Sequence, residues 1–265
     1  MSVDSLTIQI ENMAKLILDS DRIVVFTGAG VSTESGIPDF RSPGGIWSKF
    51  DPEDFTIQKF LSDPESRRKQ WKFLSESGLL TEAEPNPAHD AVAELEKMNK
   101  LEAVITQNID NLHQKAGNSP EKVFELHGNM SWVKCLNCQE RYPLEQISRR
   151  VENGEEIPEC ELCGGILKPD VILFGEALPR DVMAEAVNHS RLCDLFIVIG
   201  SSLVVYPAAY MPQYAVESGA RLIIVNMTGT SYDYMSTVVI YNRAGEVMAR
   251  VIDKVKDKVK DKIKH

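Results

Sequence analysis

Four apolar runs, each ending in small or polar residues, constrain the fold of this 265-residue chain more than any other feature. They lie at residues 22–27, 101–106, 195–200 and 221–226, with a weaker fifth run at 238–241. Stretches of helical spacing separate them, including residues 5–19 and a segment that Asn86 and Pro87 would begin and Met98 would end. Apolar strands that alternate with helices predict a parallel sheet covered on both faces.

The residues that follow these runs predict a ligand site, because ligands of open parallel sheets bind beyond the carboxyl ends of the strands. The ends read Thr-Gly-Ala-Gly, Thr-Gln-Asn-Ile-Asp, Gly-Ser-Ser and Asn-Met-Thr, which suits a nucleotide. Gly28 and Gly30 would let backbone N–H groups approach a pyrophosphate, although a tight turn has the same pattern. Thr33 replaces the third glycine of the dehydrogenase fingerprint, which disfavours a hydride-transfer enzyme.

Four cysteines predict a metal site. Cys135 and Cys138 form one C-x-x-C pair, and Cys160 and Cys163 form a second. Two such pairs place four thiolates around Zn²⁺, and four sulfur ligands leave no position for water, so the zinc would be structural. A redox pair is the main alternative, disfavoured because both pairs lie outside the strand–helix regions. Cys193 lies on an apolar stretch and is expected in the core.

Charge and hydropathy narrow the function further. The net charge of −10 does not favour a nucleic-acid or anionic-membrane ligand. No stretch approaches the roughly 20 apolar residues of a membrane span, and the N-terminus lacks a secretory pattern, so we expect a cytoplasmic protein. The Lys-rich segment 253–265 is predicted to belong to an amphipathic helix, because Val251, Val255, Val259 and Ile263 are four residues apart.

The chain also resembles the sirtuins, which are NAD-dependent protein deacylases, and specifically their bacterial and archaeal-type catalytic core. The resemblance rests on six motifs in the order in which the family has them: residues 28–41, 106–110, 126–128, 169–176, 200–203 and 225–226. It implies an α/β fold, with a Rossmann-like parallel-sheet domain and a smaller domain made of a zinc-ribbon module and a helical insertion.

The same resemblance implies a division of the chain and a reaction. Residues 1–41, 86–127 and 171–265 would form the NAD-binding domain, 42–85 the cofactor loop and helical insertion, and 128–170 the zinc-binding module. Acyl-lysine, NAD and water would give lysine, nicotinamide and O-acyl-ADP-ribose. From the residues alone, a dehydrogenase, an ADP-ribosyl transferase or a nucleic-acid-binding zinc module remain alternatives.

Residue roles carry over motif by motif. His127 would be the general base, for which an imidazole with a pKa near 6.5 is suited, and Asn108 would also be catalytic. The expected NAD contacts are Gly28, Ala29, Gly30, Ser32, Thr33, Ile37, Asp39, Phe40, Arg41, Gln107, Asn108, Ile109, Asp110, His127, Gly200, Ser201, Ser202, Asn226, Met227 and Ala244. The expected substrate channel is Val171, Ile172, Leu173, Phe174, Gly175, Glu176, Val204 and Val205. His89 and His113 are expected to be structural or to support the ligand-contacting residues from the next layer, and His189 and His265 to lie on the surface.

The expected cofactors are NAD, as co-substrate, and one structural zinc ion held by Cys135, Cys138, Cys160 and Cys163. The expected partner is an acylated, above all acetylated, lysine in a protein substrate. Direct binding to nucleic acid or membrane is not expected, and the chain should be a monomer. Residues 66–80 lack the Tyr-x-x-Arg pair of sirtuins that remove acidic acyl groups, which by analogy favours simple or apolar acyl groups.

Overall fold

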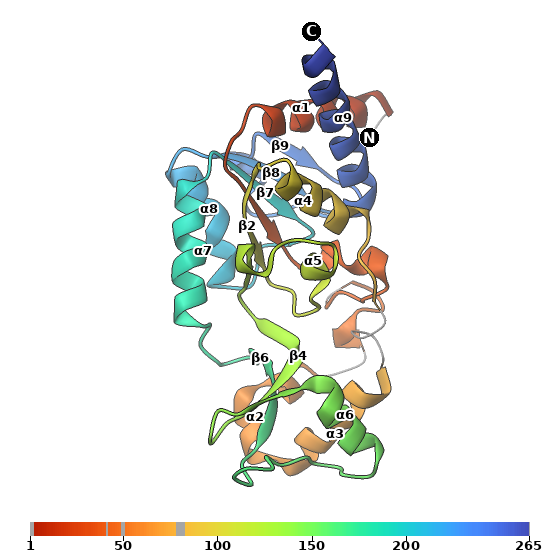
Figure 1. The fold of residues 1–265 in the computed structure, drawn as a ribbon, viewed down its shortest axis with the longest axis vertical. Helices are drawn as coiled ribbons and strands as arrows, with labels where there is room; N and C mark the ends of the chain where they lie inside the picture. Colours follow the sequence, from red (N-terminus) through yellow and green to blue (C-terminus); the bar gives the residue numbers. More distant parts are fainter. Residues whose placement is uncertain (1–2, 41, 49–50, 78–82, 265) are drawn as a thin grey trace.

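A computed structural model describes residues 3–40, 42–48, 51–77 and 83–264 of the chain. Its central feature is a six-stranded sheet of order β3-β2-β1-β7-β8-β9, in which every neighbouring pair is parallel (Figure 1). The strands are β1 (Ile23–Thr27), β2 (Leu101–Thr106), β3 (Val123–Glu125), β7 (Leu195–Ile199), β8 (Arg221–Val225) and β9 (Val238–Ile240). The predicted parallel sheet is confirmed. The five expected runs form five of its strands, and the short strand β3 adds a sixth at the edge.

Helices cover both faces of this sheet, as the alternation predicts. On one face lie α1 (Val3–Leu18), α4 (Pro87–Lys97) and α9 (Ala244–Lys264), and on the other α7 (Arg180–Leu192) and α8 (Met211–Glu217) (Figure 1). Side chains of a strand alternate between faces, so Ile23 and Val25 enter the first core and Val24 and Phe26 the second. Two independent apolar layers therefore hold the sheet.

The predicted helix that begins after Asn86 is confirmed. The Asn86 side chain accepts a hydrogen bond from Ala88 N (2.9 Å), and His89 Nδ1 accepts from Asn86 N (3.3 Å), which makes a reciprocal cap. Pro87 occupies the first turn, where its missing N–H costs nothing. The cap fixes where α4 starts, and with it the position of His89.

A second, antiparallel sheet of order β5-β4-β6 lies below the first in Figure 1. Its strands are β4 (Gly128–Cys135), β5 (Arg141–Pro143) and β6 (Leu167–Val171), and the helices around it are α2 (Ile57–Ser62), α3 (Pro64–Ser77) and α6 (Leu144–Glu152). A third apolar cluster, which includes Phe60, Trp71, Val133 and Ile147, joins the helices to this sheet. The segments that interrupt the β-α alternation thus make a separate packed unit.

Short elements connect these layers. They are α5 (Leu112–Lys115) and the 3-10 turns Ala29–Val31, Thr33–Ser35, Ile46–Ser48, Pro52–Phe55, Pro120–Lys122, Ala208–Tyr210 and Asp233–Met235.

The C-terminal segment forms the predicted amphipathic helix. Val251 and Val255 are buried against the sheet, whereas Lys254 and Lys256 pair with Glu11 of α1 and Glu94 of α4. The side chain of Ile263 lies outside the described part of the chain. Across the residues described here, no helix has both the length and the apolar character that crossing a bilayer requires.

Gly200, which follows β7, brings three strand ends together. Its carbonyl accepts from Gly30 N (2.8 Å), and its N–H donates to Val225 O (2.9 Å). Its φ is +64°, and a Cβ at this position would lie 2.2 Å from Val31 N. Only glycine fits here, for both conformational and steric reasons.

Replacing Gly200 with alanine should therefore lower the free energy of unfolding by more than replacing Gly219 does. Gly219 also has a positive φ, +96°, but an added Cβ there meets nothing within 4 Å. The left-handed conformation alone costs alanine about 1–2 kcal/mol, and the Gly200 variant adds a backbone clash. Chemical denaturation of both variants gives the comparison. Equal losses of stability would contradict the close approach described here.

Candidate active site

A cleft of about 1550 Å³ opens at the carboxyl ends of the central strands and extends toward the small sheet. It exceeds the usual size of a small-molecule pocket, roughly 300–1,000 Å³, so it can hold two ligands at once. Every expected NAD or channel residue within the described ranges lines this one cleft. Arg41, the remaining expected contact, lies outside the described residues.

The N–H groups of Gly28 and Gly30 were expected to face a pyrophosphate, and the structure shows a different arrangement. Gly28 N donates to Ile199 O (3.2 Å) and Gly30 N to Gly200 O (2.8 Å), so these two N–H groups bond to the sheet rather than pointing into the cleft. The loop leads into a 3-10 turn, Ala29–Val31, instead of a long helix. The glycines are needed because the backbone of Gly200 lies 2.8 Å from where a Cβ of Gly30 would be.

A buried hydrogen-bond network fixes the polar residues that follow β2. Asp110 accepts from Ser32 Oγ (2.7 Å) and, with its other oxygen, from Leu112 N (3.0 Å). Asn108 donates from Nδ2 to Ser32 Oγ (3.0 Å), so both side chains are tied to the glycine loop. Gln107 Nε2 donates to Ser201 Oγ (2.8 Å), which links the end of β2 to the end of β7. Such preorganised donors and acceptors suit a polar ligand.

Two buried histidines, His89 and His113, pack beneath this network, as expected for structural residues. His113 Nε2 lies 3.0 Å from Thr27 Oγ1, and the His89 and His113 rings meet edge-on at 5.0 Å. Burial lowers the pKa of both, that of His113 well below 6.5, so both are neutral at pH 7. His189 is half-buried rather than exposed, because it lies between Glu102 and Phe124. His265 lies outside the described residues.

His127 lies where the central sheet passes into the small one, between β3 and β4. Its Nδ1 is 2.9 Å from the carbonyl oxygen of Gln107. A carbonyl can only accept, so Nδ1 carries the proton and Nε2 of the neutral ring keeps a lone pair. Burial lowers the pKa of His127 below 6.5, and the hydrogen bond to the Gln107 carbonyl opposes this shift only in part. The ring is therefore neutral near pH 7.

A buried ion pair braces the expected channel segment, residues 171–176. Lys168, only 5% exposed, donates from Nζ to Val171 O and to Glu176 Oε2 (3.0 Å). The same carboxylate oxygen accepts from Leu173 N (2.7 Å). The Glu176 carboxylate is therefore occupied within the segment, and its contribution is to hold the shape of the segment. Sequence reasoning did not single out Lys168.

The same segment is also anchored from outside. Ile172 N donates to His127 O (2.9 Å), and Phe174 exchanges hydrogen bonds with Phe55 and Ile57 (both 3.0 Å). The position of the segment thus depends on both His127 and the helical insertion. Phe55, Gln70 and Phe73 of the insertion line the cleft as well, and the sequence carried no pattern that marked them.

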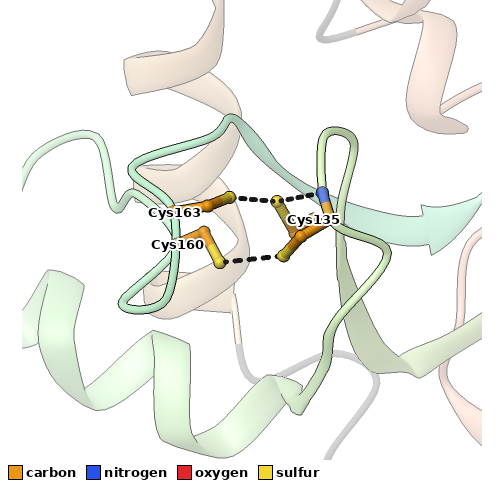
Figure 2. A group of neighbouring side chains, drawn as sticks. Cys135, Cys160 and Cys163 are labelled. Atoms are coloured by element: carbon orange, nitrogen blue, oxygen red, sulfur yellow. Dashed lines mark hydrogen bonds between the residues drawn. The ribbon is translucent and has the colours of Figure 1, made fainter.

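The four cysteines meet at one point in the small domain, and Figure 2 shows Cys135 facing Cys160 and Cys163. The sulfur pairs Cys135–Cys163 and Cys138–Cys160 are 3.6 Å apart, and all four sulfurs lie within 4.8 Å of one another. Four sulfurs at about 2.3 Å from Zn²⁺ would be about 3.8 Å apart in a tetrahedron. The donor set and its spacing fit one structural zinc ion.

Groups around the cysteines suit thiolates. Asn137 N and Cys138 N point at Cys135 Sγ (3.4 and 3.5 Å), and Tyr142 Oη lies 3.2 Å from Cys160 Sγ. Such donors stabilise metal-bound sulfur and fix its orientation. Cys193 is buried in the central domain, as expected, far from this group in the fold.

Replacing Cys135 with alanine should remove the zinc and lower the melting temperature, because a structural metal contributes its binding free energy to folding. Cys193→Ala, a buried cysteine outside the cluster, is the matched control and should keep one zinc per chain. Native mass spectrometry gives the metal content and calorimetry the melting temperature. Full zinc occupancy in the Cys135 variant would contradict the four-ligand site.

Comparison with known proteins agrees with this geometry. The Sir2 family model matches residues 28–207, more than half of the chain. The NAD-dependent protein deacetylase of Thermodesulfovibrio yellowstonii is 45% identical over 248 residues, 92% of this chain and 94% of that protein. NAD-dependent protein deacylase 2 of Archaeoglobus fulgidus is 47% identical over 248 residues, 93% and 96% of the two chains.

A solved Sir2 structure has the same fold. It is a histidine-to-alanine variant with deacetylated p53 peptide and 3′-O-acetyl ADP ribose, 41% identical, with a TM-score of 0.85. The match covers 92% of this chain and 98% of that one. The chain therefore belongs to the Sir2, or sirtuin, family, and it is an NAD-dependent protein deacetylase or deacylase with NAD as its co-substrate.

Proposed function

We propose that this chain removes simple acyl groups from lysines of intact proteins and that His127 is the general base of the reaction. The observation that carries the proposal is the hydrogen bond from His127 Nδ1 to the Gln107 carbonyl. It leaves Nε2 as a proton acceptor in the same cleft as the polar ends of the strands.

NAD would supply the ribose carbon that the acyl oxygen attacks as nicotinamide leaves. His127 Nε2 would then take the proton of a ribose hydroxyl, which attacks the acyl carbon, and water would complete the release of lysine and O-acyl-ADP-ribose. The network of Ser32, Asn108 and Asp110 would hold the nicotinamide and ribose. Ser201 and Asn226, at the ends of β7 and β8, would hold the adenosine side, with Ala244 at its rim.

The acylated peptide would bind as an added strand between residues 171–176 and 204–205. Both segments line the cleft, and Phe174 and Val204 are exposed at its edge. The ion pair of Lys168 and Glu176 would hold the shape of the first segment before the peptide arrives. This preorganisation reduces the entropy that peptide binding must otherwise overcome.

Three narrower proposals complete this function. We propose a cytoplasmic location, because a reducing compartment keeps four thiols available for zinc. We propose that the chain acts as a monomer. Direct contact with nucleic acid is not part of the proposal, given the net charge of −10.

The decisive test measures products. The purified zinc-loaded protein should release nicotinamide from NAD only when an acetyl-lysine peptide is present, and mass spectrometry should find deacetylated peptide and O-acetyl-ADP-ribose in equal amounts. Appearance of NADH absorbance, or transfer of ADP-ribose to the peptide without deacylation, would contradict the proposal.

His127→Ala should lower kcat by about 10²–10⁴-fold, the usual contribution of a general base, with little change in the Kd for NAD. As the pH of the native enzyme is lowered, kcat/KM should begin to fall only below pH 6.5. The reason is that the lowered pKa of His127 keeps its Nε2 unprotonated at pH values where a free imidazole would already be protonated. That acid limb should be missing in the variant.

His189→Ala is the matched control, because His189 lies on α7 and does not line the cleft. It should retain normal turnover and the normal acid limb. Near-native turnover of His127→Ala would remove this residue from the mechanism, whatever the products are.

A further inference from the structure

A second hollow, of about 350 Å³, lies beside the cleft, between α8 and the segment that follows β8. Its lining includes Tyr206, Tyr232, Tyr234, Met235, Gln213 and Glu217. Among the described residues that line it, one carries a negative charge and none carries a positive charge. The hollow is therefore aromatic and weakly acidic, and none of the roles assigned above uses it.

The hollow adjoins the proposed peptide site at one residue, Tyr206. Tyr206 borders both cavities and directly follows Val204 and Val205, the second segment proposed to pair with the peptide. An extended peptide advances about 3.3 Å per residue, and its side chains alternate in direction. A residue near the acyl-lysine can therefore direct its side chain over Tyr206 into the hollow.

A row of tyrosines leads away from this border and already holds a cation at its far end. The rings of Tyr206 and Tyr210 are 4.6 Å apart, and those of Tyr210 and Tyr214 are 6.3 Å apart. The guanidinium of Arg191 lies 5.2 Å from the Tyr214 ring centre. Tyr206 is 53% exposed and Tyr234 84% exposed, so their faces are accessible to an incoming side chain. Aromatic faces attract guanidinium and ammonium groups.

The hydrogen-bonding groups of the hollow also suit a cation. The Glu217 carboxylate accepts from Gln213 Nε2 (2.7 Å), which orients one of its oxygens and leaves the charge in place. Burial and the nearby Tyr206 raise the pKa of Tyr232 to about 12, so this hydroxyl stays neutral at pH 7. Glu217 therefore supplies the fixed charge of the lining, and it complements arginine or lysine.

We propose that this hollow binds an arginine or lysine side chain of the substrate protein close to the acylated lysine, and so selects substrates with a flanking cation. The inference rests on the proposed function, because it names the kind of sequence that the same peptide groove prefers. It assigns Tyr234 and Glu217 to substrate selection and gives them no part in the chemistry.

The test compares pairs of acetyl-lysine peptides that carry arginine or glutamine at one flanking position in an otherwise neutral background. At one position, arginine should lower the KM of the peptide by about three- to thirty-fold, the range of a cation–π contact, with kcat and the KM for NAD unchanged. Tyr234→Ala and Glu217→Gln should each reduce this preference without changing turnover of the neutral peptide.

Leu192→Ala and Glu185→Gln, on α7 and outside the hollow, are the matched controls and should keep the preference. The inference is overturned if no position favours arginine over glutamine, or if the preference survives unchanged in either hollow variant. In each of these cases turnover of the neutral peptide leaves the proposed function standing. Loss of turnover on every peptide would overturn the proposed function, and this inference with it.

Discussion

The contact between the backbones of Gly200 and Gly30 is the constraint on which the site depends. Gly30 N donates to Gly200 O, Gly200 N donates to Val225 O, and Gln107 N donates to Thr27 O. The ends of β1, β2, β7 and β8 are thus joined by hydrogen bonds at one edge of the sheet. The polar side chains that follow them emerge together because the backbones beneath them are in contact, with no room for a Cβ between.

The second organising feature is the passage from one sheet to the other at His127. Strand β3 ends at Glu125 and β4 begins at Gly128, so the proposed base lies on the short connection between the two sheets. Gly128 has a φ of +79°, and a Cβ there would lie 2.2 Å from Asp170 O, so β4 and β6 cross very closely. The four cysteines lie at the far ends of these strands. A change there can therefore shift the positions of His127 and the channel segment through the backbone, although the cysteines themselves do not line the cleft.

The sequence predicts most of the fold because the signals are local. Buried strands such as Leu195–Ile199 are continuous apolar runs, and the two C-x-x-C pairs reflect a coordination chemistry that few other structures need. Strand β3 is a three-residue, half-buried edge strand, and the short apolar run at residues 123–126 indicates it less strongly than the longer runs indicate theirs. The residues that follow the apolar runs predicted a ligand site at the strand ends, and the structure brings them together in one cleft.

Other features depend on tertiary contacts that no local pattern records. Lys168 looks like a surface residue in the sequence, and only the fold places Glu176 and the Val171 carbonyl around its ammonium group. Likewise, Gly28 and Gly30 resemble a phosphate loop, whereas their N–H groups bond to Ile199 at the end of β7 and to Gly200 directly after it.

The ion pair that braces the channel segment also restricts how the chain can change over time. Neutralising Glu176 alone would leave the Lys168 ammonium as an unpaired buried charge, which is strongly destabilising, and neutralising Lys168 alone would leave the half-buried Glu176 carboxylate without its cation. Replacing both together by apolar side chains would avoid that penalty but would lose the hydrogen bonds to Val171 and Leu173. Positions 168 and 176 are therefore expected to vary among descendants of this chain only as a linked pair.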